Sequence, residues 1–201
     1  MDNYLKRQLL YEHAVKKINK YSNDFIVLSF HYYSKKSYLA RFIQWISRVK
    51  GYEEIAHTAA IYKFGSDPRF FESKYKGINH SGLYDSIFDG NFEGKVTAHV
   101  LPAKQTAYKR QKLIYYIEHK LLGGHYGTLQ ALGSLLDIVI EENDIKKNHF
   151  CSKLVSYIYQ MIIDNSCFFG HNNSKLCPAE FYKLVGERAI YNFTVFDSKK
   201  I

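Results

Sequence analysis

The segment 146–162, KKNHFCSKLVSYIYQMI, places Cys151 in what its apolar spacing predicts to be the first turn of an amphipathic helix. Asn148 is a favoured N-cap residue, which would put Cys151 at the third helical position. Unpaired backbone N–H groups and the helix dipole stabilise a thiolate there and lower the pKa of the thiol. The pattern suits a cysteine nucleophile, although a cysteine beside apolar residues such as Phe150 and Leu154 is more often part of a packed core.

A thiol nucleophile needs a base that accepts its proton, and the base needs a partner that orients its ring. His57 stands where the run AHTAAIY begins a predicted strand, so the strand would hold its side chain rigidly, but eight other histidines compete for this role. Glu72 lies in the next predicted strand, RFFESKY, between apolar neighbours. An acid in that setting is either paired or on the solvated face, and for an isolated glutamate the solvated face is the more common arrangement.

Hydrophobic periodicity predicts the elements that would position these side chains. Residues 4–21 have apolar side chains at helical spacing, 24–33 (DFIVLSFHYY) favour a buried strand, and 34–52 favour a second helix. Short β-rich runs follow, separated by Gly, Ser-Asp-Pro and Asp-Gly, and they occupy 56–64, 69–75, 76–82 and 95–102. This pattern is typical of an antiparallel meander.

The second half of the chain returns to helical patterns. They extend over 106–124 and 126–140, over the Cys151 segment, and over 177–188, where Pro178 takes a favoured first helical position. The alternating tail 189–196 should rejoin the sheet. The expected fold class is therefore α+β, with an antiparallel sheet packed against helices.

Composition indicates one domain over residues 1–201, with 1–22 as an N-terminal helical extension. A hydrophobic content of 46% and an aromatic content of 16% are ample for a core, and no repeat or linker marks a boundary. There is no apolar run long enough for a membrane span and no signal-peptide pattern, so we expect the product to be cytoplasmic at synthesis. The richness in Lys, Asn, Ile and Tyr would suit a phage, a virus or a low-GC bacterium, and delivery to another compartment stays open.

Two rival functions are weaker. The net charge of +9 could attract nucleic acid, membrane or cell wall, but the basic residues alternate with acids and no nucleic-acid-binding motif accompanies them. A zinc site could use Cys167, His171 and Cys177, yet their spacing fits no common zinc pattern and a fourth ligand is missing. Three cysteines without a CxxC pair argue against a disulfide framework and leave a free thiol.

Several short motifs together resemble the permuted papain-like cysteine hydrolases of the NlpC-type superfamily, in the YiiX-like, poxvirus-homologue branch. In chain order these motifs are AHTAAIY, FFESKYKGI, GGHYG, HFCSKLVSYIYQ and LCPAEFY. The resemblance spans about residues 24 to 185. In this branch the chain is circularly permuted, so the cysteine helix follows the histidine strands, as Cys151 follows His57 and Glu72 here.

The resemblance implies that Cys151 is the nucleophile, His57 the general base and later acid, and Glu72 the residue that orients His57. Tyr126, in GGHYG, matches a tyrosine near the family's site and would line the substrate pocket, donate to an oxyanion or pack in the core. The main-chain N–H of Cys151 would be a second oxyanion donor. The chain departs from the family at Lys153, where an acid is common, and this affects partner or substrate preference more than chemistry. We expect no cofactor and no metal.

The expected reaction is cleavage of an amide, isopeptide or ester acyl bond through a thioester intermediate. Family members have been linked to both murein peptides and lipids, so a peptide, a peptidoglycan or a lipid-type N-acyl substrate is compatible. Aromatic residues expected around the site permit an apolar pocket, and they include Phe70, Phe71, Tyr75 and Tyr126. The basic chain could contact an anionic wall or membrane surface. The alternatives are an inactive papain-like fold that acts as a binding protein and a basic nucleic-acid-binding module.

Overall fold

The computed structural model describes residues 2–33, 45, 48–49, 57–74, 77–103, 106–125, 151–163 and 177–201. The strands in these ranges are β1 (Phe25–Tyr32), β2 (His57–Lys63), β3 (Arg69–Lys74), β4 (Gly77–Gly82), β5 (Gly94–Leu101) and β6 (Tyr191–Asp197). The α-helices are α1 (Asn3–Lys20), α3 (Ala107–Tyr116), α5 (Cys151–Ile163) and α6 (Pro178–Arg188). Shorter helical turns are η1 (Tyr84–Phe88), η2 (Ile117–Leu121) and η3 (Ser198–Lys200).

The described strands form one six-stranded sheet in the order β4-β3-β2-β1-β5-β6, and every neighbouring pair is antiparallel. The predicted α+β class and the antiparallel sheet are confirmed. The predicted meander is correct for β2, β3 and β4 but wrong for β5, which lies between β1 and β6. The connection after β4 explains the position of β5. Its buried side chains Leu83, Ile87 and Phe88 pack against the sheet, so the chain crosses the sheet and β5 pairs with the edge of β1 opposite β2.

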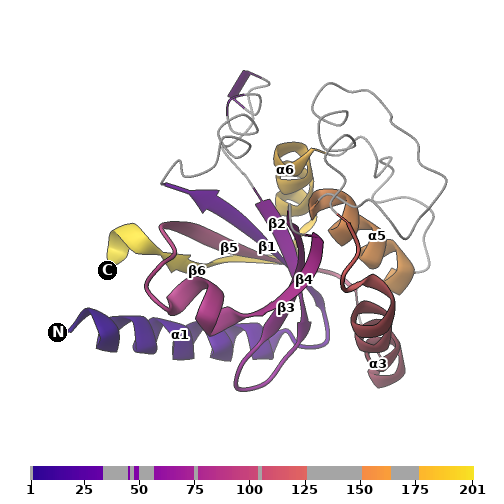
Figure 1. Ribbon diagram of the computed structural model, residues 1–201, viewed down its shortest axis with the longest axis horizontal. Coiled ribbons are helices and arrows are strands. Elements are labelled where there is room, and N and C mark those ends of the chain that lie inside the picture. Colours follow the sequence, from indigo (N-terminus) through magenta and orange to yellow (C-terminus); the bar gives the residue numbers. More distant parts are fainter. Residues whose placement is uncertain are drawn as a thin grey trace.

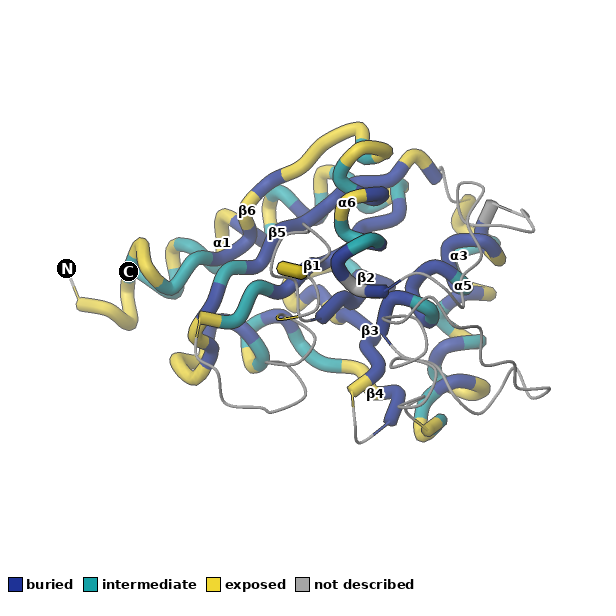
Figure 2. The backbone as a smooth tube through the Cα atoms, turned by 90° about the horizontal axis from the view of Figure 1, so that it is seen from above, coloured by how far each residue is buried: buried dark blue, intermediate teal, exposed yellow. Residues whose placement is uncertain are grey.

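Each face of the sheet has its own hydrophobic core. Successive side chains of β2 point to opposite faces of the sheet. Ala60 and Tyr62 therefore belong to one core, and Ala59 and Ile61 belong to the other. Helices α3, α5 and α6 cover the first face, and α1 with η1 covers the second (Figure 1). The inner strands β1, β2, β3 and β5 are mostly buried between these helices, whereas the edge strands β4 and β6 and the outer side of α1 carry exposed residues (Figure 2).

Local sequence signals explain several helix boundaries. The Asp2 side chain accepts a hydrogen bond from the Tyr4 N–H and caps α1, and Ala14 and Ile18 bury the inner face of this helix. Pro178 begins α6 after Cys177, whose sulfur accepts from the Glu180 N–H. These elements and the tail strand β6 confirm their predictions.

Two predicted helices cannot be compared in full with the structure. The helix over 34–52 lies outside the described residues apart from 45, 48 and 49, and the helix over 126–140 lies wholly outside them. Across the described ranges, none of the helices is both long and apolar enough to cross a membrane.

Candidate active site

His57 is the first residue of β2 and pairs with Phe30 near the end of β1. The two rings are 5.4 Å apart between centroids, so Phe30 supports one side of the imidazole. Only 7% of His57 is exposed, and its main chain pairs with Phe30 of β1, which is itself paired with β5 on its other side. The ring is therefore held by packing and by the sheet, as a base in a rigid site requires.

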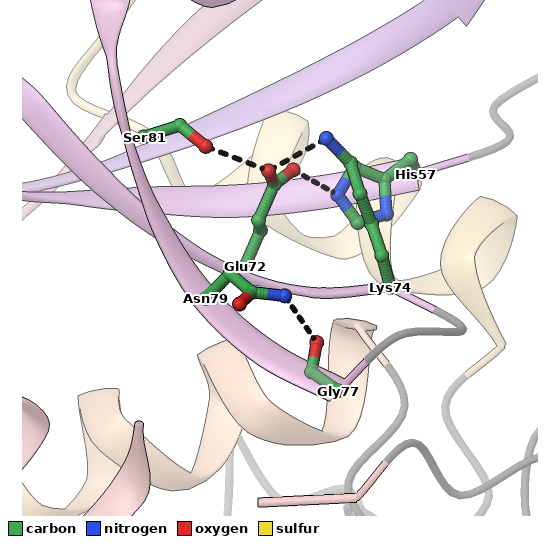
Figure 3. A network of polar contacts seen from close by, with 6 residues as sticks. All are labelled: His57, Glu72, Lys74, Gly77, Asn79 and Ser81. Atoms are coloured by element: carbon green, nitrogen blue, oxygen red, sulfur yellow. Dashed lines mark hydrogen bonds and ion pairs between the residues drawn. The ribbon is translucent and has the colours of Figure 1, made fainter. Parts of the chain in front are cut away.

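Glu72 lies on β3 and meets His57 on the same face of the sheet. His57 Nε2 donates to Glu72 Oε2 over 2.8 Å (Figure 3). Glu72 is only 2% exposed, so the expectation that it lies on the solvated face is wrong. Sequence reasoning missed the burial because a single glutamate between apolar residues does not reveal its partners, which lie on β2 and β4 and within β3 itself.

The second carboxylate oxygen of Glu72 is also occupied. Ser81 Oγ donates to Oε1 over 3.1 Å, and Lys74 Nζ lies 2.6 Å from the same oxygen (Figure 3). The sequence analysis named neither residue. The period of two within β3 puts Lys74 on the face of Glu72, and the β3–β4 hairpin register places Ser81 within reach, so strand alternation was the signal that could have found them.

Cys151 is at the beginning of α5 as the structure describes this helix, and it is 1% exposed. Burial alone would raise the pKa of its thiol. The hydrogen bond with His57, the positive charge of that ring and a main-chain hydrogen bond from Thr58 outweigh burial and lower the pKa. Helix α5 packs on the sheet face opposite the His57 side chain. The Cys151 sulfur therefore meets the His57 imidazole at the start of β2, beside Thr58.

The histidine and the glutamate stabilise each other as charged groups. Burial would lower the pKa of His57, but its hydrogen bonds to Cys151 and Glu72 and their negative charges raise it to about 9. Burial would raise the pKa of Glu72, but the hydrogen bond and charge of His57 and the ion pair with Lys74 lower it to about 2. The site therefore stabilises the charged forms of all three groups, a thiolate, an imidazolium and a carboxylate.

Tyr32, at the end of β1, is a further group near the site that the sequence analysis did not name. Its ring stacks on Phe30, with 6.4 Å between centroids. Burial, together with the negative charges of Glu72 and Cys151, raises the pKa of this phenol, so it stays neutral through the physiological range. The predicted substrate-contacting residue Tyr126 lies outside the described residues.

In the described part of the chain, no three His, Cys, Asp or Glu side chains are grouped so that they could hold a metal ion. Of the three zinc candidates, Cys177 is buried at the N-terminus of α6, whereas Cys167 and His171 lie outside the described residues.

No known family model matches the sequence, and no curated protein has a significant match to it. Function must be inferred from the residues and their geometry.

The arrangement has the parts that nucleophilic acyl chemistry needs. A sulfur with a lowered pKa contacts a histidine, and the other ring nitrogen of the histidine is fixed by a buried carboxylate. Because Nε2 donates to Glu72, Nδ1 is the ring nitrogen left for exchange of a proton with Cys151. The three residues that the sequence analysis selected, Cys151, His57 and Glu72, thus lie together.

Proposed function

We propose that this protein is a cysteine hydrolase that cleaves an amide, isopeptide or ester acyl bond through a thioester intermediate. The single observation that carries the proposal is the linked contact of Cys151 with His57 and of His57 with Glu72, the latter over 2.8 Å in a buried setting. Buried charges are rare unless they are paired, and a thiol with a lowered pKa beside a histidine is typical of reactive cysteines.

In the first step, the Cys151 thiolate attacks the acyl carbon and forms a carbon–sulfur bond. The main-chain N–H of Cys151 and other donors near the helix start would stabilise the negative charge on the acyl oxygen. The bond to the leaving amine or alcohol then breaks, and the His57 imidazolium gives its proton to the leaving group.

In the second step, water attacks the thioester carbon while neutral His57 accepts a proton from that water. The carbon–sulfur bond breaks, the acid product leaves, and the thiolate and imidazolium are restored. Glu72 remains ionised throughout, because its pKa of about 2 lies well below that of His57. Its role is to orient the imidazole and to stabilise the imidazolium form.

The same proposal includes a circularly permuted papain-like fold. It is supported by the order in which the chain supplies the site, with the histidine strand β2 first, the acid strand β3 second and the cysteine helix α5 last. It is also supported by the packing of α5 on the sheet beside β2 and β3. This order agrees with the resemblance to the permuted, YiiX-like branch of the NlpC-type superfamily.

The substrate class that we propose is a peptide, a peptidoglycan peptide or a lipid-type N-acyl or ester compound. The shared requirement is an acyl carbon that a thiolate can attack. The net charge of +9 supports an encounter with an anionic wall or membrane surface, where such substrates occur.

Mass spectrometry of alkylated peptides tests the nucleophile directly, with Cys177 as a matched control. Both thiols are buried at the beginning of a helix, and Cys151 is the one that also contacts His57. We expect the iodoacetamide rate of Cys151 to rise with pH through a midpoint well below the ordinary thiol value of about 8.5, and that of Cys177 to rise later. The midpoint is compared rather than the absolute rate, because burial slows both thiols.

A panel of p-nitrophenyl esters and aminoacyl amides then tests turnover. We expect Cys151→Ala to abolish hydrolysis and acylation of the protein, while Cys177→Ala retains both. If Cys151 titrates like Cys177 and no acyl group attaches to Cys151 from any member of the panel, the hydrolase proposal is wrong. The same fold would then serve as a binding protein.

A further inference from the structure

We propose that Lys74 is a positioning residue of the candidate site, which holds one oxygen of Glu72 and balances the charge of the cysteine–histidine pair. The inference rests on the proposed function, because it assigns Lys74 a task in the same acyl-transfer reaction. Neither the residue pattern nor the resemblance assigned a role to this lysine.

The two carboxylate oxygens of Glu72 have different partners. Oε2 accepts from His57 over 2.8 Å, whereas Oε1 is bound by Lys74 over 2.6 Å and by Ser81 over 3.1 Å (Figure 3). A carboxylate with one free oxygen could rotate and exchange the atom that it offers to the imidazole. Because Oε1 is bound from two directions, Oε2 remains directed at His57.

Lys74 also balances the charge of the site. A thiolate, an imidazolium and a carboxylate together carry one net negative charge in a buried site, which is costly without compensation. The ammonium of Lys74 removes this excess, while its side chain remains 45% exposed and its charge is partly solvated. The reacting centre is thereby neutral, and a thiolate can form without accumulating negative charge next to Glu72.

The titratable groups of the described residues that face this centre come from four elements. They are Tyr32 on β1, His57 on β2, Glu72 and Lys74 on β3, and Cys151 on α5. Tyr32 stays neutral, and Glu72 keeps its ion pair with His57 when the lysine is lost. The loss of Lys74 therefore acts on the titration of Cys151 and His57, and it acts on both in the same direction.

Lys74→Met removes the cation with little change of volume. Without it the thiolate is less favourable and the imidazolium more favourable, so the midpoints of Cys151 alkylation and of the His57 ring NMR titration should both move to higher pH. We expect each to move by about half a unit, which lowers the alkylation rate about threefold on the acid side of the profile. Lys74→Arg keeps the positive charge and should restore both midpoints. If the methionine variant does not fold, Lys74→Gln, which keeps a hydrogen-bond donor but no charge, tests the same upward shift of the two midpoints.

Lys63→Met is the matched control. Lys63 also ends a strand of this sheet, is 39% exposed and forms an ion pair, but its partner is Glu118 rather than a residue of the site. The same loss of charge there should leave both midpoints unchanged. Ser81→Ala removes a neutral donor from Oε1 and should lower turnover of an ester substrate without moving either midpoint.

The outcomes separate this inference from the proposed function. If Cys151 in the wild-type protein titrates at low pH but Lys74→Met leaves both midpoints in place, the role of Lys74 is wrong and the hydrolase proposal survives. If wild-type Cys151 titrates like an ordinary thiol, both proposals are wrong. Parallel upward shifts that arginine reverses and Lys63→Met does not reproduce would support the role of Lys74.

Discussion

Glu72 accepts its hydrogen bond from His57 diagonally across two neighbouring strands. The residue of β2 that pairs in register with Glu72 is Ala59, two positions after His57 and on the same face. β2 and β3 both lie inside the sheet, with a strand on each side. The 2.8 Å contact is therefore set by backbone pairing rather than by loops, which is the kind of support that holds a reactive geometry without a reorganisation cost.

Glu72→Gln should slow hydrolysis strongly without abolishing it. The amide still offers an oxygen to His57, but it carries no charge, so the pKa of His57 falls and less imidazolium is present to stabilise the thiolate. We expect turnover of a p-nitrophenyl ester to fall on the order of a hundredfold. The high-pH limit of activity should also move to lower pH, as steady-state rates measured across pH would show.

Glu118→Gln is the control for this change. Glu118 is likewise paired with a lysine, but it lies on η2 and its partner is Lys63, which is not part of the site. Its neutralisation should leave the rate and the pH limits unaltered. Equal effects of the two variants would mean that Glu72 acts only through overall charge or stability, and the orienting role would be lost.

The stability of the fold should depend on pH through the same pair. The folded-state pKa of Glu72 is lowered from 4.5 to about 2, so its contribution is present above about pH 4.5 and is lost as pH falls towards 2. The folded-state pKa of His57 is raised from 6.5 to about 9, so its contribution is complete below about pH 6.5 and is lost as pH rises through 9. Urea unfolding measured across pH should show both losses, the acidic one on the order of 3 kcal/mol.

Cys151→Ala should change the alkaline limb of the curve of unfolding free energy against pH and leave the acidic limb in place. The thiolate is one of the groups that raise the pKa of His57, so its removal should make the alkaline loss of stability begin at lower pH. The acidic limb, which comes from Glu72, should keep its position because His57 and Lys74 remain. An alkaline limb identical to that of the wild-type protein would show that Cys151 and His57 do not share charge in solution.

Local sequence signals were sufficient for much of the fold. Apolar spacing located α1, Pro178 located the start of α6, and alternation located β6, because each of these depends on residues close together in the chain. The place of β5 was not predictable in this way. Its position beside β1 depends on how the segment with Leu83, Ile87 and Phe88 packs across the sheet, which is a long-range property.

The candidate site shows the same division. Residue type and spacing selected Cys151, His57 and Glu72, but they gave the wrong surroundings for Glu72, since the burial of one acid depends on partners from other strands. Lys74 was missed because a lysine at a strand end is usually a solvated residue. Only the fold reveals that its ammonium reaches the carboxylate.

Substitutions in helix α1 would show whether the N-terminal segment is part of the cooperatively folded domain or only an extension of it. Ile18 is fully buried in the core on the α1 side of the sheet, together with Phe30, which supports His57. Ile18→Ala should therefore destabilise the whole fold by about 2–5 kcal/mol in urea unfolding, because it leaves a cavity between α1 and the sheet. Leu9→Ala removes the same kind of side chain from a half-exposed position of the same helix and should cost only about 0.5 kcal/mol. If the two variants lose equally little, α1 does not contribute to the cooperative core, and the sheet that carries His57 and Glu72 folds without it.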